Sequence, residues 1–275
     1  MKMEHYMLNN SVKIPKIGFG TWQIPAGEEA YEATMEALKA GYRHIDTAAA
    51  YRNEASIGKA IHDSGIPRDQ LFVTSKLAAD KKGYDVAREE FQATLDRLDF
   101  DYLDLYLIHW PKPWGVEGDG YEYNDQNVDT WKAFIDLQKE GKIRAIGVSN
   151  FNPGHLKPLL EQTDVVPQVN QIFLAPGHLQ PETISYCEER NIVLEAYSPL
   201  GTGSVFDVDK LEHIAERYDK TVAQLAIRWS LQKGFLPLPK SATKSHIKEN
   251  LDVFDFAISE SDINKIDDVT LPPRN

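Results

Sequence analysis

The chain has 275 residues, of which 42% are hydrophobic, and it carries a formal net charge of -12. This length fits one (β/α)8 barrel, which needs about 250 residues, or two smaller domains. The negative charge repels phosphate backbones and argues against nucleic acid as the main partner, and no apolar run reaches the ~18 residues of a membrane-spanning helix.

Cysteine usage and the start of the chain indicate the compartment. Cys187 is the only cysteine, so no disulfide can form within the chain and a reducing environment is expected. Residues 1–6 lack the charged-then-apolar pattern of a secretory signal. We therefore expect a cytoplasmic protein that does not bind a membrane.

Short apolar runs alternate with helical patterns along the whole chain, which predicts a parallel sheet. The first two runs differ: they flank Asn9-Asn10-Ser11 and predict an antiparallel hairpin, with strands at 6–8 and 12–14, that closes one end of a barrel. Eight further strands are expected at residues 17–20, 43–45, 71–75, 103–108, 144–148, 167–170, 192–197 and 236–238. Helices are expected at residues 28–40, 54–64, 85–98, 130–140, 153–161, 180–190, 209–218, 222–233 and 244–253.

These elements predict an α/β fold, a (β/α)8 TIM barrel formed as one domain by residues 1–275 with a short C-terminal tail. A doubly wound open sheet is the competing fold. The segment Gly18-Phe19-Gly20-Thr21-Trp22-Gln23 begins like a dinucleotide-binding glycine motif. The motif then fails, because Gln23 stands where the last glycine belongs and Pro25 interrupts the expected start of the helix.

Several predicted strands run into polar residues. Asp46 ends one strand and is followed by Tyr51, Lys76 ends the next, and His109 follows the one after that. The carboxyl ends of barrel strands converge on one face, so we expect these four side chains to lie around one point. Together they are the parts of a proton-donating site.

Each of these residues also has an ordinary structural explanation when taken alone. An Asp–Lys pair can simply hold two strands, a tyrosine can be a half-buried packing residue, and His109 can be a core histidine. No metal site is predicted, because His44 and Asp46 share a strand face but no further ligand has suitable spacing, and Cys187 stands alone.

Seven segments in order along the chain form a recognisable set: Gly18–Trp22, Gly41–Ala48 with Tyr51 and Asn53-Glu54, Leu107–Pro111, Ile146–Phe151, Val169–Gln171, Ala196–Gly201 and Pro239–Ser241. Through them the sequence resembles the aldo-keto reductase family from about Met7 to Ile266, and it looks closest to short bacterial members such as the diketogluconate and glyoxal reductases. The resemblance implies a (β/α)8 barrel and NAD(P)H-dependent reduction of a carbonyl group.

Carbonyl reduction needs a hydride on carbon, which only a cofactor can supply, and a proton on oxygen. We expect Tyr51 to be the acid, with the Lys76 ammonium lowering its pKa and Asp46 holding that ammonium in place. His109 would orient the substrate carbonyl by a hydrogen bond. Matching the family residue by residue gives the same four roles.

The resemblance also implies how the cofactor, NADP(H) with NAD(H) as a further possibility, would be held. Ser149, Asn150 and Gln171 match residues that bind the nicotinamide carboxamide, and Tyr197 would stack on the ring. The remaining matches are Gly20 and Thr21 near the ribose, Ser198, Leu200 and Gly201 along the pyrophosphate, and Lys240, Ser241, Thr243, His246, Glu249 and Asn250 around the adenosine.

One departure concerns His246, which stands where the family commonly has an arginine that pairs with the 2′-phosphate. A mostly neutral imidazole lacks the permanent charge and the fork of a guanidinium. We therefore expect a weakened preference for NADP(H) over NAD(H), with Lys240, Thr243 and Lys244 keeping phosphate binding possible.

The substrate pocket is expected to be aromatic. Its predicted lining is Trp22, Tyr51, His109, Trp110 and Trp114, the last on a loop over residues 111–127. Three departures from the family accompany it: the sequence Phe173-Leu174-Ala175-Pro176, the short stretch 201–207 and the short tail after Ile266. Together they predict an open site for small aldehydes, dicarbonyls or keto sugars, in a protein expected to be a monomer.

Two other functions remain possible at this point. A lyase could use Lys76 as a Schiff-base nucleophile, although the expected pairing with Asp46 opposes the neutral amine that this chemistry needs. A redox-sensing subunit could bind nucleotide without significant turnover.

Overall fold

Eight parallel strands form one sheet whose order in space follows their order in the chain. The computed structural model describes residues 4–273. Every strand from β3 to β10 lies next to the strand that follows it in sequence. The strands are β3 (Phe19–Gly20), β4 (His44–Asp46), β5 (Phe72–Leu77), β6 (Leu103–Ile108), β7 (Ile143–Ser149), β8 (Val169–Phe173), β9 (Val193–Tyr197) and β10 (Leu236–Leu238).

The sheet closes on itself between its first and last strands. The amide of Gly18 donates to the carbonyl of Pro237 across 3.1 Å, and that of Gly20 donates to Pro239 across 3.0 Å. A side chain at Gly18 would meet Leu238 at 2.6 Å and His44 at 2.7 Å, so only glycine permits this approach. The predicted (β/α)8 barrel is thereby confirmed.

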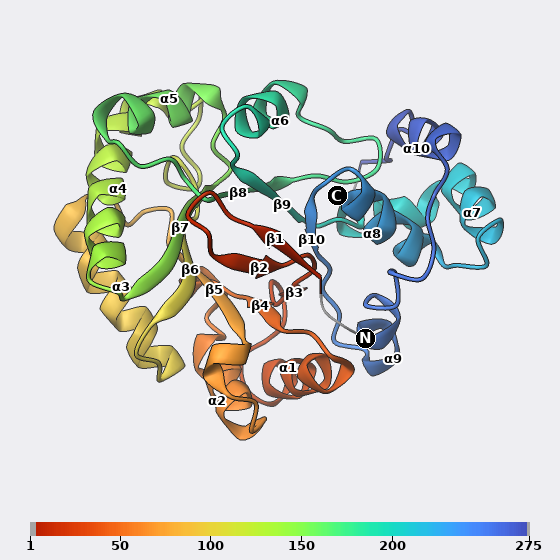
Figure 1. Ribbon diagram of the computed structural model, residues 1–275, viewed down its shortest axis with the longest axis horizontal. Helices are drawn as coiled ribbons and strands as arrows, with labels where there is room; N and C mark the ends of the chain where they lie inside the picture. The colour runs from red at the N-terminus through yellow and green to blue at the C-terminus, as the bar shows by residue number, and fades with distance from the viewer. Residues whose placement is uncertain (1–3, 274–275) are drawn as a thin grey trace.

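An antiparallel hairpin lies across the amino ends of the strands, as Figure 1 shows at its centre. It consists of β1 (His5–Met7) and β2 (Lys13–Pro15), with Tyr6 opposite Ile14. Its turn is held by hydrogen bonds from the Asn9 amide to the carbonyl of Pro167 and from the Asn10 amide to that of Arg144. The expectation that a hairpin closes one end of the barrel is therefore correct.

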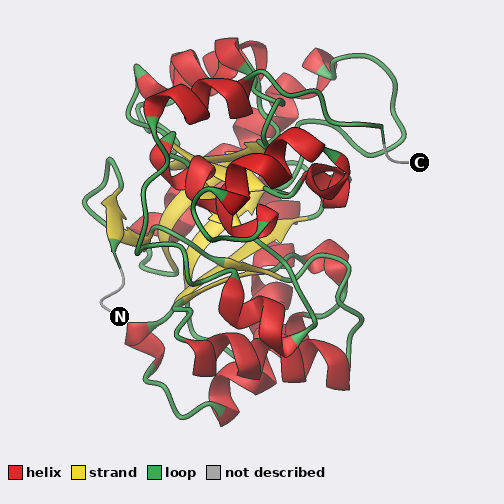
Figure 2. Ribbon diagram, turned by 90° about the vertical axis from the view of Figure 1, so that its right-hand side faces the viewer, coloured by secondary structure: helices red, strands yellow, loops and turns green. Residues whose placement is uncertain are grey.

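The apolar interior has two parts. A large cluster joins the outer face of the sheet to the surrounding helices. A smaller one fills the barrel itself, where Leu8 and Ile14 of the hairpin segment pack with Leu105, Leu107 and Leu236. Figure 2 shows the hairpin at one end of the strands and the C-terminal segment at the other.

Ten α-helices lie in the described part of the chain. They are α1 (Glu28–Ala40), α2 (Glu54–Asp63), α3 (Tyr84–Leu98), α4 (Asn124–Lys139), α5 (Pro153–Gln162), α6 (Pro181–Glu188), α7 (Asp209–Glu216), α8 (Val222–Gln232), α9 (Lys244–Glu249) and α10 (Glu260–Asp267). Short 3-10 turns are η1 (Ala49–Tyr51), η2 (Arg68–Gln70), η3 (Tyr121–Tyr123) and η4 (Gly201–Asp207). None of the helices between residues 4 and 273 is long and apolar enough to cross a membrane.

The structure corrects the bounds of two predicted helices and adds one helix. Helix α4 begins at Asn124 instead of residue 130, because η3 leads directly into it and shortens the preceding loop. Helix α9 ends at Glu249 and not at 253, and α10 was not predicted. The hairpin strands lie within one residue of their predicted bounds, whereas residues 1–3 of the segment judged for a secretory signal lie outside the described residues.

Candidate active site

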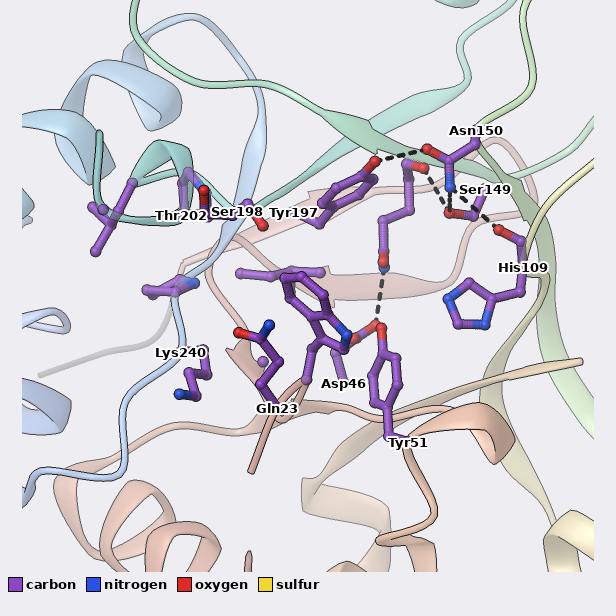
Figure 3. Close-up of a pocket in the computed structure, with 18 of the residues that line it drawn as sticks. Gln23, Asp46, Tyr51, His109, Ser149, Asn150, Tyr197, Ser198, Thr202 and Lys240 are labelled. Atoms are coloured by element: carbon purple, nitrogen blue, oxygen red, sulfur yellow. Dashed lines mark hydrogen bonds between the residues drawn. The ribbon is translucent and has the colours of Figure 1, made fainter. Parts of the chain in front are cut away.

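A cavity of about 660 Å³ opens at the carboxyl ends of the barrel strands, opposite the hairpin (Figure 3). Asp46, Tyr51 and His109 surround one part of it, and Lys240 lies toward the other. Its complete lining is Gly20, Trp22, Gln23, Asp46, Tyr51, His109, Trp110, Trp114, Ser149, Asn150, Gln171, Tyr197, Ser198, Pro199, Leu200, Thr202, Gly203, Phe206, Leu238, Pro239 and Lys240. This volume is typical of a small-molecule site, for which about 300–1,000 Å³ is usual.

The Lys76 ammonium connects the floor of the cavity to Tyr51. It is fully buried and donates to Asp46 Oδ1 across 2.6 Å, to the Thr47 carbonyl across 2.9 Å and to the Tyr51 hydroxyl across 3.3 Å. β4 and β5 are neighbours with Asp46 opposite Thr74, two residues before Lys76, which brings the two charges together. The structure therefore assembles Asp46, Lys76 and Tyr51 as the strand ends predicted.

The pKa of Tyr51 differs from the sequence-based expectation. Desolvation raises the pKa of Tyr51, the charge of Lys76 opposes this, and the charge of Asp46 adds to the rise. Lys76 thus lowers the pKa of Tyr51 as expected, but burial and Asp46 outweigh it, so the net pKa is raised, which the sequence did not predict. The phenol keeps its proton at neutral pH, which is the form that an acid needs before it reacts.

Lys76 itself remains charged. Burial alone would lower its pKa, but the attraction of Asp46, and then that of Tyr51, gives a net pKa above the usual value. A Schiff-base nucleophile needs the neutral amine, so this environment opposes the lyase alternative.

His109 faces the same space as Tyr51. Their rings meet edge to face with centroids 5.6 Å apart, and Trp114 covers His109 with a centroid distance of 5.2 Å. Burial, aided by the charge of Lys76, lowers the pKa of His109 well below its usual value. The imidazole is therefore neutral, with one nitrogen available as a donor and the other as an acceptor.

Asn53 ties together the two loops that carry Tyr51 and Trp22. Its buried amide donates to the carbonyls of Thr21 and Ile24 across 3.0 and 3.1 Å, and it accepts a bond from the Thr47 hydroxyl across 2.8 Å. Arg52, just before it, has a left-handed backbone with φ 59°, which turns the chain from η1 into α2. These hydrogen bonds of Asn53 hold in place the wall of the cavity that carries Tyr51.

A second polar group lies on the opposite wall. The Asn150 amide donates to the His109 carbonyl across 3.2 Å and to the Ser149 hydroxyl across 2.9 Å, and it accepts from the Tyr197 hydroxyl across 2.9 Å (Figure 3). The ring of Tyr197 stacks on Phe173 at 5.8 Å between centroids. These contacts hold Ser149, Asn150 and Tyr197 along one side of the cavity.

Gln171 and Glu195 form a buried pair below this wall. The Gln171 amide nitrogen donates to Asp46 Oδ2 across 2.9 Å and to Glu195 Oε2 across 2.7 Å. Glu195 is fully buried, and the sequence analysis did not identify it. Its signal was available, since Glu195 lies two residues before Tyr197 and the two side chains of a strand at that spacing point to the same face.

The sequence-predicted cofactor residues divide into two groups. Eight line the cavity: Gly20, Ser149, Asn150, Gln171, Tyr197, Ser198, Leu200 and Lys240. Seven lie outside its lining: Thr21, Gly201, Ser241, Thr243, His246, Glu249 and Asn250.

Two of the seven have partners that explain their placement. Thr21 is buried and donates to the Asp46 carbonyl across 2.9 Å, so it braces the strand end. The Glu249 carboxylate accepts a bond from the Thr221 hydroxyl across 2.7 Å. His246, in contrast, is exposed on α9, beyond the Lys240 end of the cavity.

All five residues expected at the substrate lie in the lining, namely Trp22, Tyr51, His109, Trp110 and Trp114. Trp22 is 44% exposed and Trp114 is 50% exposed, so both form an open aromatic rim. The lining residues that the sequence analysis missed are Gln23, Pro199, Thr202, Gly203, Phe206, Leu238 and Pro239. Within residues 4–273, no group of three or more His, Cys, Asp or Glu side chains could hold a metal ion.

A closed (β/α)8 barrel with a buried Asp–Lys–Tyr cluster at the carboxyl ends of its strands has the architecture of a barrel enzyme. Comparison with known proteins defines the class further. The sequence model of the Aldo/keto reductase family matches residues 16–270. A glyoxal reductase of Bacillus subtilis is 45% identical over 94% of this chain and 90% of its own length.

Solved structures agree with this result. An aldo/keto reductase from Brucella melitensis superimposes with a TM-score of 0.90 at 43% identity, covering 97% of this chain and 99% of the other. A Bombyx mori aldo-keto reductase in complex with NADP gives a TM-score of 0.86 at 34% identity, covering 97% and 92%. The chain belongs to the aldo/keto reductase family, and it is an oxidoreductase.

Proposed function

We propose that the protein reduces small aldehydes and dicarbonyl compounds to alcohols, with NADP(H) as its main cofactor and Tyr51 as the proton donor. The observation that carries this proposal is the placement of a protonated phenol, a charged Lys76 and a neutral His109 around one part of the cavity. The glyoxal reductase of Bacillus subtilis and the NADP complex of the Bombyx mori enzyme support it.

The long cavity suits a dinucleotide. Ser149 and Asn150 offer a hydroxyl and an amide on one wall, and Tyr197 offers a ring. At Gly20 an added Cβ would lie only 3.0 Å from the Leu238 carbonyl, so the close approach of β3 to β10 at this edge of the cavity favours glycine. Ser149, Asn150, Gln171 and Tyr197 would hold the nicotinamide, which supplies the hydride when bound. Lys240 would hold phosphate at the far end.

Proton transfer follows from the charges around Tyr51. The neutral phenol donates its proton to the oxygen of the substrate, and the phenolate that remains lies 3.3 Å from the Lys76 ammonium. The charge of Lys76 favours this phenolate, while Asp46 keeps the ammonium at that position. His109, being neutral, donates a hydrogen bond to the same substrate oxygen and thereby orients it.

The substrate would enter between Trp22 and Trp114, whose exposed rings leave the mouth open. This rim favours small carbonyl compounds that need few specific contacts. Keto sugars also remain within the proposed range.

His246 would weaken the preference for NADP(H) over NAD(H). The exposed imidazole stands where a permanently charged guanidinium could pair with the 2′-phosphate. We further propose that the chain acts as one domain, as a monomer, in the cytoplasm, where a chain with the single cysteine Cys187 suits a reducing environment.

The test measures oxidation of NADPH and NADH with glyoxal, methylglyoxal, simple aldehydes and keto sugars. Tyr51→Phe removes the acidic hydroxyl and keeps the ring, so turnover should fall at least about a hundredfold. Tyr84→Phe is the matched control, because the Tyr84 hydroxyl binds Asp136 on the helical surface. Full activity of Tyr51→Phe would disprove the assigned acid, and nucleotide binding without oxidation across the panel would favour the redox-sensing alternative.

A further inference from the structure

Glu195 is a buried carboxyl group to which the proposed reaction assigns no role. It lies on β9 with no exposed surface, and its Oε2 accepts the 2.7 Å bond from the Gln171 amide nitrogen. The same nitrogen donates to Asp46 Oδ2 across 2.9 Å. An amide nitrogen carries two hydrogens, so Asp46 and Glu195 together use both donors of Gln171.

We propose that Glu195 is a positioning residue that fixes the Gln171 amide with its nitrogen held inside the barrel and its oxygen free for the cofactor. The inference rests on the proposed function, since it takes the cavity as the dinucleotide site. Gln171 lines this cavity, and with both its amide hydrogens engaged it can offer only an acceptor there. The site would then select a ligand group that donates, as an amide NH2 does.

Without Glu195 the orientation of the Gln171 side-chain amide would be less well defined. Rotation of a side-chain amide by half a turn exchanges the positions of its oxygen and nitrogen. The orientation that forms more hydrogen bonds is the more stable one. Asp46 alone would hold one hydrogen through its Oδ2, because its Oδ1 already accepts the 2.6 Å bond from Lys76. The second acceptor, from the adjacent strand β9, fixes both hydrogens of the Gln171 amide.

The surroundings indicate that Glu195 acts as the neutral acid. Its Oε1 has no hydrogen-bond partner, and the nearest basic nitrogen is His44 Nε2 at 3.8 Å. Burial lowers the pKa of His44 to about 3, so this ring cannot supply a positive charge. Burial, reinforced by the charge of Asp46 and opposed by the Gln171 bond and by Lys76, raises the pKa of Glu195 to about 8. A neutral Glu195 adds no second negative charge beside Asp46, so the charges of Lys76 and Asp46 compensate each other.

The experiment measures NADP+ binding by fluorescence quenching at pH 7, so that no turnover is needed. Glu195→Leu should raise the Kd at least about tenfold, because it removes one acceptor from Gln171. Glu195→Gln keeps a neutral acceptor of the same shape and should bind within about threefold of wild type. If Glu195→Leu binds as tightly as wild type, the inference is wrong, and if Glu195→Gln weakens binding as much as leucine, the neutral acid is wrong.

Two further variants separate positioning from a general loss of stability. In a Gln171→Leu background, Glu195→Leu should weaken binding no further, because its effect passes through Gln171; additive losses would contradict the inference. Asp104→Asn changes another fully buried carboxylate, which binds Arg68 and Arg144 away from the cavity lining. It should lower stability and leave the Kd unchanged, and a comparable loss of binding would reveal a nonspecific effect.

The same titration distinguishes this inference from the function on which it rests. Wild-type protein that binds neither NADP+ nor NAD+ would overturn the proposed function. Wild-type binding that Glu195→Leu leaves intact would overturn only the role of Glu195. If Glu195→Leu does not fold, Glu195→Met, which also removes the acceptor but is closer in shape, takes its place in the same titration, and wild-type affinity in it would overturn the role of Glu195.

Discussion

The Lys76 ammonium lies 3.3 Å from the Tyr51 hydroxyl, and it is held there by Asp46 at 2.6 Å. Both members of the ion pair are almost completely buried. Removing one charge from such a pair leaves the other unpaired in the interior, at a cost of about 3–5 kcal/mol. The contact between amine and phenol thus links the chemistry of the site to the stability of the barrel.

Lys76→Met should therefore lower both the free energy of unfolding, by about 3–5 kcal/mol, and the turnover. Urea unfolding and carbonyl reduction would be measured on the same preparation. Tyr51→Phe is the comparison, because it removes the reacting hydroxyl but keeps the ion pair, and its stability should stay close to that of wild type. Undiminished turnover in Lys76→Met would show that the ammonium does not assist Tyr51.

His246→Arg should increase the preference for NADPH over NADH by about tenfold or more. A guanidinium on α9 would add a permanent charge and a two-pronged contact for the 2′-phosphate. The ratio of kcat/KM for the two cofactors measures this effect. His213→Arg makes the same exchange on α7 and should leave the ratio unchanged. A wild-type ratio already above about a thousandfold, roughly 4 kcal/mol, would contradict the expectation of a weakened preference.

Asn53→Ala should reduce stability and catalysis together. The change removes three buried hydrogen bonds and leaves the carbonyls of Thr21 and Ile24 without their partner. We expect the free energy of unfolding to fall by about 2–3 kcal/mol and kcat/KM by about tenfold, as the loops bearing Trp22 and Tyr51 lose their brace. Asn124→Ala, which removes a single 3.3 Å bond to the Gly154 carbonyl, should have little effect on either quantity.

Stability should depend on pH through Glu195. Its pKa is raised to about 8 in the folded protein, so the folded state retains a proton that the unfolded chain releases above its ordinary value of 4.5. The stabilisation from this proton is complete below pH 4.5 and is lost as the pH rises toward 8. Lys76, whose pKa is raised, keeps its charge over this range, and His44, with its pKa lowered to about 3, stays neutral above pH 5.

Unfolding by urea at pH 6, 7, 8 and 9 would measure this dependence. The stability of Glu195→Gln relative to wild type should increase with pH and level off above about pH 8. A difference that stays constant from pH 6 to pH 9 would mean that Glu195 does not titrate in this range.

Much of the barrel was predictable because its strands are short apolar runs separated by glycine and proline. Helix α1 matches its expected bounds, and Gly41, with φ 115°, ends it as the sequence suggests. The start of helix α4 was harder to predict, because Asn124 and Asp125 are residue types typical of loops. They are helical here because the turn η3 runs directly into α4. Helix α10 is short and polar on its exposed side, so its hydrophobic pattern was too weak to predict a helix.

The strand-end residues of the site were predictable for a similar reason, since a polar residue at the end of a buried strand must face the mouth of the barrel. The pKa of Tyr51 was not, because it depends on burial as well as on the neighbouring charges. Glu195 was missed although it lies two residues before Tyr197 on β9, because its contact with Gln171 on β8 becomes apparent only in the folded barrel. Thr202 and Phe206 reach the cavity through η4, whose kink at Thr202 and Gly203 has no clear sequence pattern.

The hairpin β1–β2 has a practical consequence for handling the protein. It covers the end of the barrel that faces away from the cavity, and its residues Leu8 and Ile14 are packed into the interior. An immobilisation tag fused before this hairpin would attach the protein to a support through the hairpin end of the barrel. The opening of the cavity would then face the solution. Immobilisation from that side should leave diffusion of reactants unimpeded.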